Sequence, residues 1–154
     1  AEAGSEFNAP ERQKIDDYTR KNALGLVIGD LEWPEFADVR ISDMLYGIQF
    51  REGMRYTFSG SFVDLRITDC DYGIYIPMYT VSRRGKTWGV AVANGIIEGS
   101  EYAILQEDYS AVQLTNVEVV GKVKSHWDGE PIKQYKTDTS SFSPDYHITY
   151  KKAR

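Results

Sequence analysis

The sequence predicts an all-β fold of the parallel β-helix class, with a chain that winds through about four coils. The eleven residues from Asp38, DVRISDMLYGI, match the eleven from Asp64, DLRITDCDYGI, at seven positions. Weaker copies begin in phase at Asn94 and Asn116. Short apolar runs in each copy are separated by Gly, Ser, Asp and Asn, and no helical pattern lies between copies. The spacing between copies varies, which is typical of stacked repeats with free loops.

The segment before the repeats predicts a tag followed by a helix. Residues 1–7, AEAGSEF, read as a vector-derived tag and take no part in the fold prediction. Residues 8–24 predict a helix, because Pro10 lies near the start and good helix formers follow. A stack of strands leaves unpaired edges at its ends, so we expect this helix to act as a cap.

Residues 25–124 are predicted to form the coils of a single solenoid, with three short strands in each coil. In the second copy the strands are Tyr56–Phe62, Leu65–Ile67 and Ile74–Ile76. Equivalent inward residues should stack one strand spacing apart. The predicted ladders are Ile41–Ile67–Ile97–Val119 and Ile48–Ile74–Ile104, and the predicted corner column is Asp38–Asp64–Asn94–Asn116. Short polar side chains tolerate left-handed backbone geometry, so this column should turn at a corner and face solvent.

From Ser125 the rhythm stops, and residues 125–154 are predicted to form an irregular tail with Pro131 and Pro144. We expect the chain to be a fragment of a longer stack. The net charge of −5 argues against nucleic acid as a partner, and no apolar run is long enough for membrane insertion. Cys70 is the only cysteine, which excludes an internal disulfide and a cysteine-based metal site.

The blocks GLVIGDLEWPEFADVRISDMLYGIQF, TFSGSFVDLRITDCDYGIYI and WGVAVANGIIEGSEYAI give the chain a family resemblance. From Leu24 to about Lys124 it resembles the right-handed parallel β-helix proteins of the pectate-lyase-like superfamily, especially glycosyl-hydrolase-28-related members and phage tailspikes. The resemblance implies an extracellular, cell-surface or virion-surface protein that interacts with polysaccharide. Tailspike-like relatives form trimers, so the resemblance leaves open whether this chain forms a homo-oligomer.

Three functions follow from these observations as hypotheses. The first is a carbohydrate-binding segment of a polysaccharide-interacting protein. The second is the catalytic portion of a polysaccharide lyase or glycoside hydrolase, although the paired aspartates, Gly-His-Gly and Arg-Ile-Lys of polygalacturonase-type members are absent. The third is a structural shaft. A fold of this kind supports all three, so the residues of the site must decide.

An acidic strip is the candidate catalytic site, because two carboxylates at a suitable separation can cleave a glycoside. Oxygen ligands could also hold Ca²⁺ there, and the alternative is a row of solvated turn acids. The strip consists of Asp43, Asp69, Asp71, Glu98 and Glu101.

The candidate ligand-binding site centres on the long loop from Pro77 to Trp88, since loops on a rigid scaffold often carry function. Its basic and aromatic side chains suit an anionic glycan, and Arg66 could bind a uronate carboxylate or pair with a neighbouring acid. Tyrosines in one register, Tyr46, Tyr72 and Tyr102, could form a sugar platform or an internal stack. The predicted ligand contacts are Tyr75, Tyr79, Arg83, Arg84, Lys86, Trp88 and Arg66.

Overall fold

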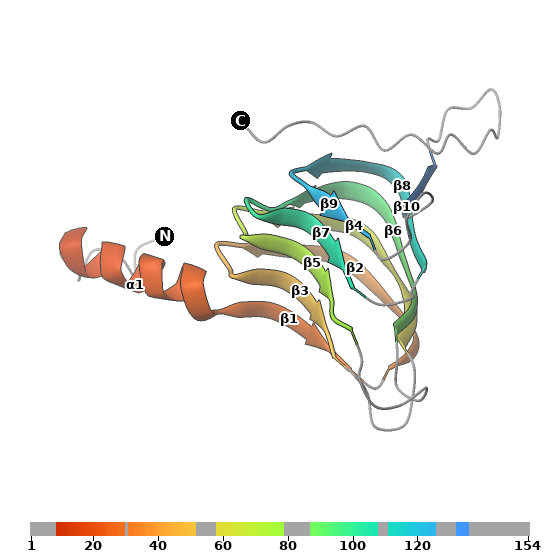
Figure 1. Ribbon diagram of the computed structural model, residues 1–154, viewed down its shortest axis with the longest axis horizontal. Helices are drawn as coiled ribbons and strands as arrows, with labels where there is room; N and C mark the ends of the chain where they lie inside the picture. Colours follow the sequence, from red (N-terminus) through yellow and green to blue (C-terminus); the bar gives the residue numbers. More distant parts are fainter. Residues whose placement is uncertain are drawn as a thin grey trace.

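The computed structural model describes residues 9–29, 31–51, 58–78, 87–107, 111–125 and 132–135. Within these ranges, helix α1 (Ala9–Asn22) precedes ten strands, which alternate along the chain between two parallel sheets (Figure 1). The short-stranded sheet contains β1 (Leu24–Ile28), β3 (Tyr46–Phe50), β5 (Tyr72–Ile76), β7 (Tyr102–Gln106) and β9 (Val123–Lys124). The long-stranded sheet contains β2 (Glu32–Ser42), β4 (Phe58–Thr68), β6 (Thr87–Glu98), β8 (Ala111–Val120) and β10 (Ile132–Tyr135).

The prediction of a parallel β-helix, a closed solenoid with three strands per coil, is wrong. Each repeat contributes two strands, one to each of two separate five-stranded sheets. Phe58–Phe62, the described part of the predicted strand Tyr56–Phe62, and the predicted strand Leu65–Ile67 belong to one continuous strand, β4. Its pairing with β6 continues through the expected corner, from Phe62↔Val92 to Leu65↔Gly95. The all-β character of the repeats is confirmed.

The corner column bends the long strands without ending them. Asp38, Asp64, Asn94 and Asn116 all adopt the predicted left-handed backbone conformation, with φ between 53° and 59°, and all are exposed. A left-handed residue interrupts the two-residue alternation of a strand. The fully buried Phe62 and Leu65 are therefore three positions apart in β4, with Asp64 between them facing solvent.

The core lies between the two sheets and follows the predicted ladders. The pairs Ile41↔Ile67, Ile67↔Ile97 and Ile97↔Val119 are confirmed in the long-stranded sheet. The pairs Ile48↔Ile74 and Ile74↔Ile104 are confirmed in the short-stranded sheet. A third ladder contains stacked aromatic rings, with the Phe36 and Phe62 centroids 4.9 Å apart. In-register parallel pairing thus repeats each inward side chain from strand to strand.

The C-terminal part of the stack differs from the prediction of an irregular tail. Strand β10 lies in that segment and pairs with β8, beginning at Ile132↔Val112. Gln106, which pairs with Ile76, is fully buried, and Ser125 Oγ donates a hydrogen bond of 3.0 Å to its Oε1. Burial of an amide is tolerated because this bond satisfies a polar atom.

Helix α1 occupies most of the predicted helical segment and extends away from the start of β1 (Figure 1). At its C-terminal end Asn22 Nδ2 donates to the Tyr18 carbonyl at 2.8 Å, and the Ala23 amide donates to the Thr19 carbonyl. These bonds satisfy carbonyls that a helix end leaves unpaired. Within the described residues no helix has the length and apolar character needed to span a membrane. The role of α1 as a cap for the strand edges stays a prediction.

Tight turns join the long strands to the short strands, and glycines let the two sheets approach each other there. A Cβ atom on Gly73 would collide with the Ala103 carbonyl oxygen and would lie 2.7 Å from Ile97 Cγ2 in the facing sheet. Gly47 is equally restricted by Gly73 and Ile67. The repeated Tyr-Gly therefore has a packing origin, because only glycine leaves room for the neighbouring backbone.

Substitution at this approach should be costly. We expect Gly73→Ala to lower the free energy of unfolding by about 2 kcal/mol or more, because overpacking displaces backbone as well as side chains. Gly29→Ala is the matched control, since a Cβ there meets nothing within 4 Å, and should change stability by less than about 0.5 kcal/mol. Urea unfolding followed by circular dichroism measures both. Equal stability of the two variants would contradict the close approach of the sheets.

Candidate ligand-binding site on the long-stranded sheet

The outward face of the long-stranded sheet carries a groove of about 390 Å³, which we call the tryptophan groove. Its wall on the edge strand β2 is formed by Trp33, and its floor crosses β4, β6 and β8. The lining residues are Trp33, Pro34, Ser59, Gly60, Ser61, Gly89, Val90, Ala91 and Gln113.

Trp33 is unusually exposed for its size, at 81%. It adopts a left-handed conformation with φ of 52°, where the pairing of β2 with β4 shifts between Glu32 and Glu35. Irregularities of this kind re-aim side chains in strands. The indole is therefore held at the surface and contributes to the wall of the groove.

The floor of the groove is shallow because its outward side chains are small. In-register pairing aligns Ser61 with Ala91 and Ala91 with Gln113, and it aligns Ser59 with Gly89. Serine hydroxyls and the Gln113 amide can donate and accept hydrogen bonds. The arrangement combines one aromatic face with several hydrogen-bonding groups.

A second, charged groove of about 330 Å³ lies farther along the same strands, at the left-handed corner. Arg40 pairs with Arg66 across β2 and β4, and both are exposed. Arg40 Nε lies 3.3 Å from Asp38 Oδ1, whereas Arg66 forms no ion pair within the part of the chain that the structure describes. The groove therefore places a guanidinium, a strong donor to carboxylate, beside Asn94 and the acidic side chains of Asp38, Asp64 and Glu118.

The predicted tyrosine register forms a stacked cluster on the short-stranded sheet. Ring centroids of Tyr46 and Tyr72 lie 4.8 Å apart, those of Tyr72 and Tyr102 lie 6.2 Å apart, and Tyr75 stacks on Tyr46 at 5.1 Å. Because these rings cover one another's faces, the cluster offers little aromatic face to a sugar. All four tyrosines are half-buried, and the choice between a sugar platform and an internal stack stays a prediction.

Tyr75 has a specific polar partner in this cluster. Its hydroxyl donates a hydrogen bond of 2.9 Å to Glu107 Oε2. Burial, this hydrogen bond and the nearby negative charge raise the pKa of Tyr75 to about 12. Each of these effects favours the neutral phenol over the phenolate.

The five predicted catalytic acids lie on successive turns and strand ends along one side of the stack. Asp43 and Asp69 are exposed and left-handed, with φ of 59° and 53°. Glu98 ends β6 and is half-buried, and Glu101 is exposed. Among the described residues, no three His, Cys, Asp or Glu side chains are grouped to hold a metal ion. Their catalytic role and the binding of Ca²⁺ stay predictions.

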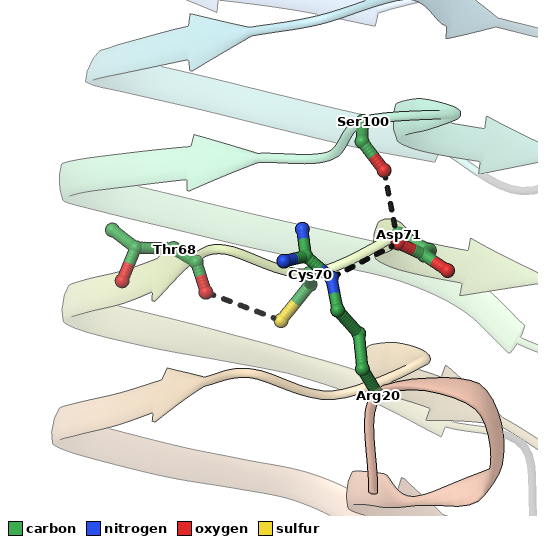
Figure 2. A network of polar contacts seen from close by, with 5 residues as sticks. All are labelled: Arg20, Thr68, Cys70, Asp71 and Ser100. Carbon is green, nitrogen blue, oxygen red and sulfur yellow. Dashed lines mark hydrogen bonds and ion pairs between the residues drawn. The ribbon is translucent and has the colours of Figure 1, made fainter. Parts of the chain in front are cut away.

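Asp71 differs from the other acids because it is engaged from two sides (Figure 2). Arg20 of α1 approaches Asp71 Oδ1 to 3.5 Å, and Ser100 Oγ donates to the same oxygen at 2.9 Å. The neighbouring Cys70 thiol is buried and donates to the Thr68 carbonyl at 3.4 Å. Burial raises the pKa of Cys70, so the thiol is a poor nucleophile. The polar contacts here connect α1 to the turns.

The predicted basic and aromatic loop lies almost wholly outside the described residues, including Tyr79, Arg83, Arg84 and Lys86; Trp88 is placed only as part of β6. Sequence reasoning missed Trp33. A signal for it was present, because LEWPEF puts a large aromatic residue between acids and directly before proline, where a strand interior is disfavoured. Its exposure, however, depends on the register shift of an edge strand.

The titration of Tyr75 tests its contact with Glu107. In Glu107→Gln the charge is lost, so the pKa of Tyr75 should fall from about 12 toward 10.0. Because the folded-state pKa is raised, the stability linked to Tyr75 is present below pH 10 and is lost as the pH rises through 12. Phenolate absorbance during a pH titration measures the shift, with Tyr75→Phe to identify the signal. An unchanged late titration in Glu107→Gln would contradict the contact.

Comparisons with protein-family models, with curated proteins and with solved structures found no match.

Proposed function

We propose that the chain binds carbohydrate in the tryptophan groove, as part of a polysaccharide-interacting protein that acts outside the cell. The observation that carries the proposal is the 81% exposure of Trp33 at the wall of a groove with a polar floor. Sugar rings have apolar faces that stack on aromatic rings and hydroxyl edges that need hydrogen bonds. An indole beside serine and glutamine side chains supplies both kinds of contact.

The shape of the groove suits an extended ligand. It crosses four neighbouring strands, β2, β4, β6 and β8, which corresponds to roughly 14 Å at the usual strand spacing. Ser59 and Ser61 lie on β4 next to Trp33, and Gln113 lies on β8 at the far side. A chain of more than one sugar ring would therefore contact the indole and the glutamine together.

Arg66 adds a site for a charged substituent. It lies on β4, five residues beyond Ser61 on the same outward face, and lines the charged groove. A guanidinium binds carboxylate through two parallel hydrogen bonds. An acidic sugar bound along β4 could therefore use Trp33 for stacking and Arg66 for its carboxylate.

Affinity electrophoresis in gels that contain neutral or acidic polysaccharides tests this function. We expect at least one polysaccharide to retard the chain, and Trp33→Ala to weaken that retention about tenfold or more, since the variant loses both buried area and ring stacking. Leu24→Ala is the control, because Leu24 is also an exposed apolar residue, at 36%, but lies on β1 of the other sheet, outside the groove. Arg66→Gln should weaken only the binding of acidic polysaccharides.

Two outcomes would contradict the proposal. Equal retention of the native chain and Trp33→Ala would show that polysaccharide does not bind in the tryptophan groove. Release of reducing ends from a bound polysaccharide would show catalysis and favour the acidic residues on the turns.

A further inference from the structure

The stack has an open end at its first strands. β1 and β2 are the edge strands of their sheets, and both edges lie at the same end (Figure 1). The inward residues Phe36, Val39 and Ile41 of β2 are only half-buried. Their partners one strand further on, Phe62, Leu65 and Ile67, are fully buried. The core is therefore uncovered at this end in the described part of the chain, and an apolar surface of this kind favours a partner.

Helix α1 has a second unpartnered surface. Its side chains are almost all exposed, including Ile15 at 50% and Tyr18 at 70%. A 14-residue helix is marginal in water without tertiary packing. Lys14, Tyr18 and Lys21 are spaced by four and three residues, so they share one face, with Ile15 beside them. This face combines apolar and basic side chains with one acid, Glu11, which lies three residues before Lys14.

The chain holds α1 in an orientation that keeps the two surfaces apart. Arg20 pairs with Asp71, which lies on the turn between β4 and β5 (Figure 2). Arg20 is two residues after Tyr18, which places it about 200° around the helix. The face with Tyr18 therefore points away from the sheets, and α1 extends sideways from the start of β1 instead of across the open end of its own chain (Figure 1).

The two surfaces are complementary in charge. The edge strand β2 exposes Glu32 and Glu35 beside the open end. The exposed face of α1 carries Lys14 and Lys21 and one acid, Glu11, so positive charge is in excess there. Opposite charges across an interface fix the partner and the orientation. Since both surfaces belong to the same chain, a two-fold dimer would form the contact between α1 and the open end twice, once in each direction.

We propose that the chain forms a two-fold dimer in which α1 of each copy covers the open end of the other. Ile15 and Tyr18 contact the uncovered core residues of the partner, and Lys14 and Lys21 face Glu32 and Glu35 of the partner copy. A helix across edge strands also prevents further strand pairing. This inference does not depend on carbohydrate binding.

A charge-swap experiment on the full chain tests the dimer. Sedimentation velocity across a concentration series should give twice the mass of 17.5 kDa for the native chain. Lys14→Glu with Lys21→Glu makes both surfaces acidic, and Glu32→Lys with Glu35→Lys makes both basic. Each doubly substituted chain should associate at least about tenfold more weakly than the native chain. An equal mixture of the two should regain the doubled mass, since every helix then meets an oppositely charged edge.

Further variants separate this interface from other occupants of the open end. Tyr18→Asp should give a monomer and Tyr18→Phe a dimer, while Met78→Asp, at an exposed apolar residue elsewhere, should leave the dimer intact. Circular dichroism should show the strands unchanged in all of them. A native chain that stays at 17.5 kDa at every concentration overturns the proposal, and so does a mixture that fails to recover the doubled mass.

Discussion

In-register parallel pairing is the constraint on which the rest of this structure depends. Once β4 pairs with β2 and β6, every inward residue must pack beneath an equivalent residue at the usual strand spacing. This requirement explains why the sequence repeats. It explains isoleucine above isoleucine in the core, and it explains why Gly73 follows Gly47 where the sheets approach each other.

The same constraint shapes the surface. Outward side chains are also repeated from strand to strand, so small residues on β4 and β6 produce a shallow floor and tyrosines produce a stack. A repeated aromatic side chain covers part of its neighbour, and the stacked tyrosines are half-buried. Trp33 stays exposed because it lies on an edge strand, at a shift in register, and has no equivalent aromatic residue on the next strand. Function in such a surface is expected where repetition fails.

Much of the repeat could be predicted from the sequence, and the limits of the prediction have physical causes. The ladders through Ile67 and Ile74 and the left-handed corner at Asp64 follow from alternation and from the short polar residue at the turn. The number of strands per repeat did not follow, because a left-handed residue can end a strand or only bend it, and hydrogen bonding to neighbouring strands decides which. The structure places Asp43, Asp69 and Asp71 on turns and Glu98 at the end of β6, but the engagement of Asp71 by Arg20 depends on the path of α1. The groove beside Trp33 depends on which strand lies at the edge, a property of the whole sheet.

Gln106 makes the two ends of the stack chemically different. It occupies the position of Ile76 on the next strand and turns an apolar ladder polar, with Ser125 as its hydrogen-bond partner. At β1 and β2 the ladders remain apolar up to the last strand. The two ends of the stack therefore differ in chemistry, and the apolar end at β1 and β2 is the one that a hydrophobic surface would cover.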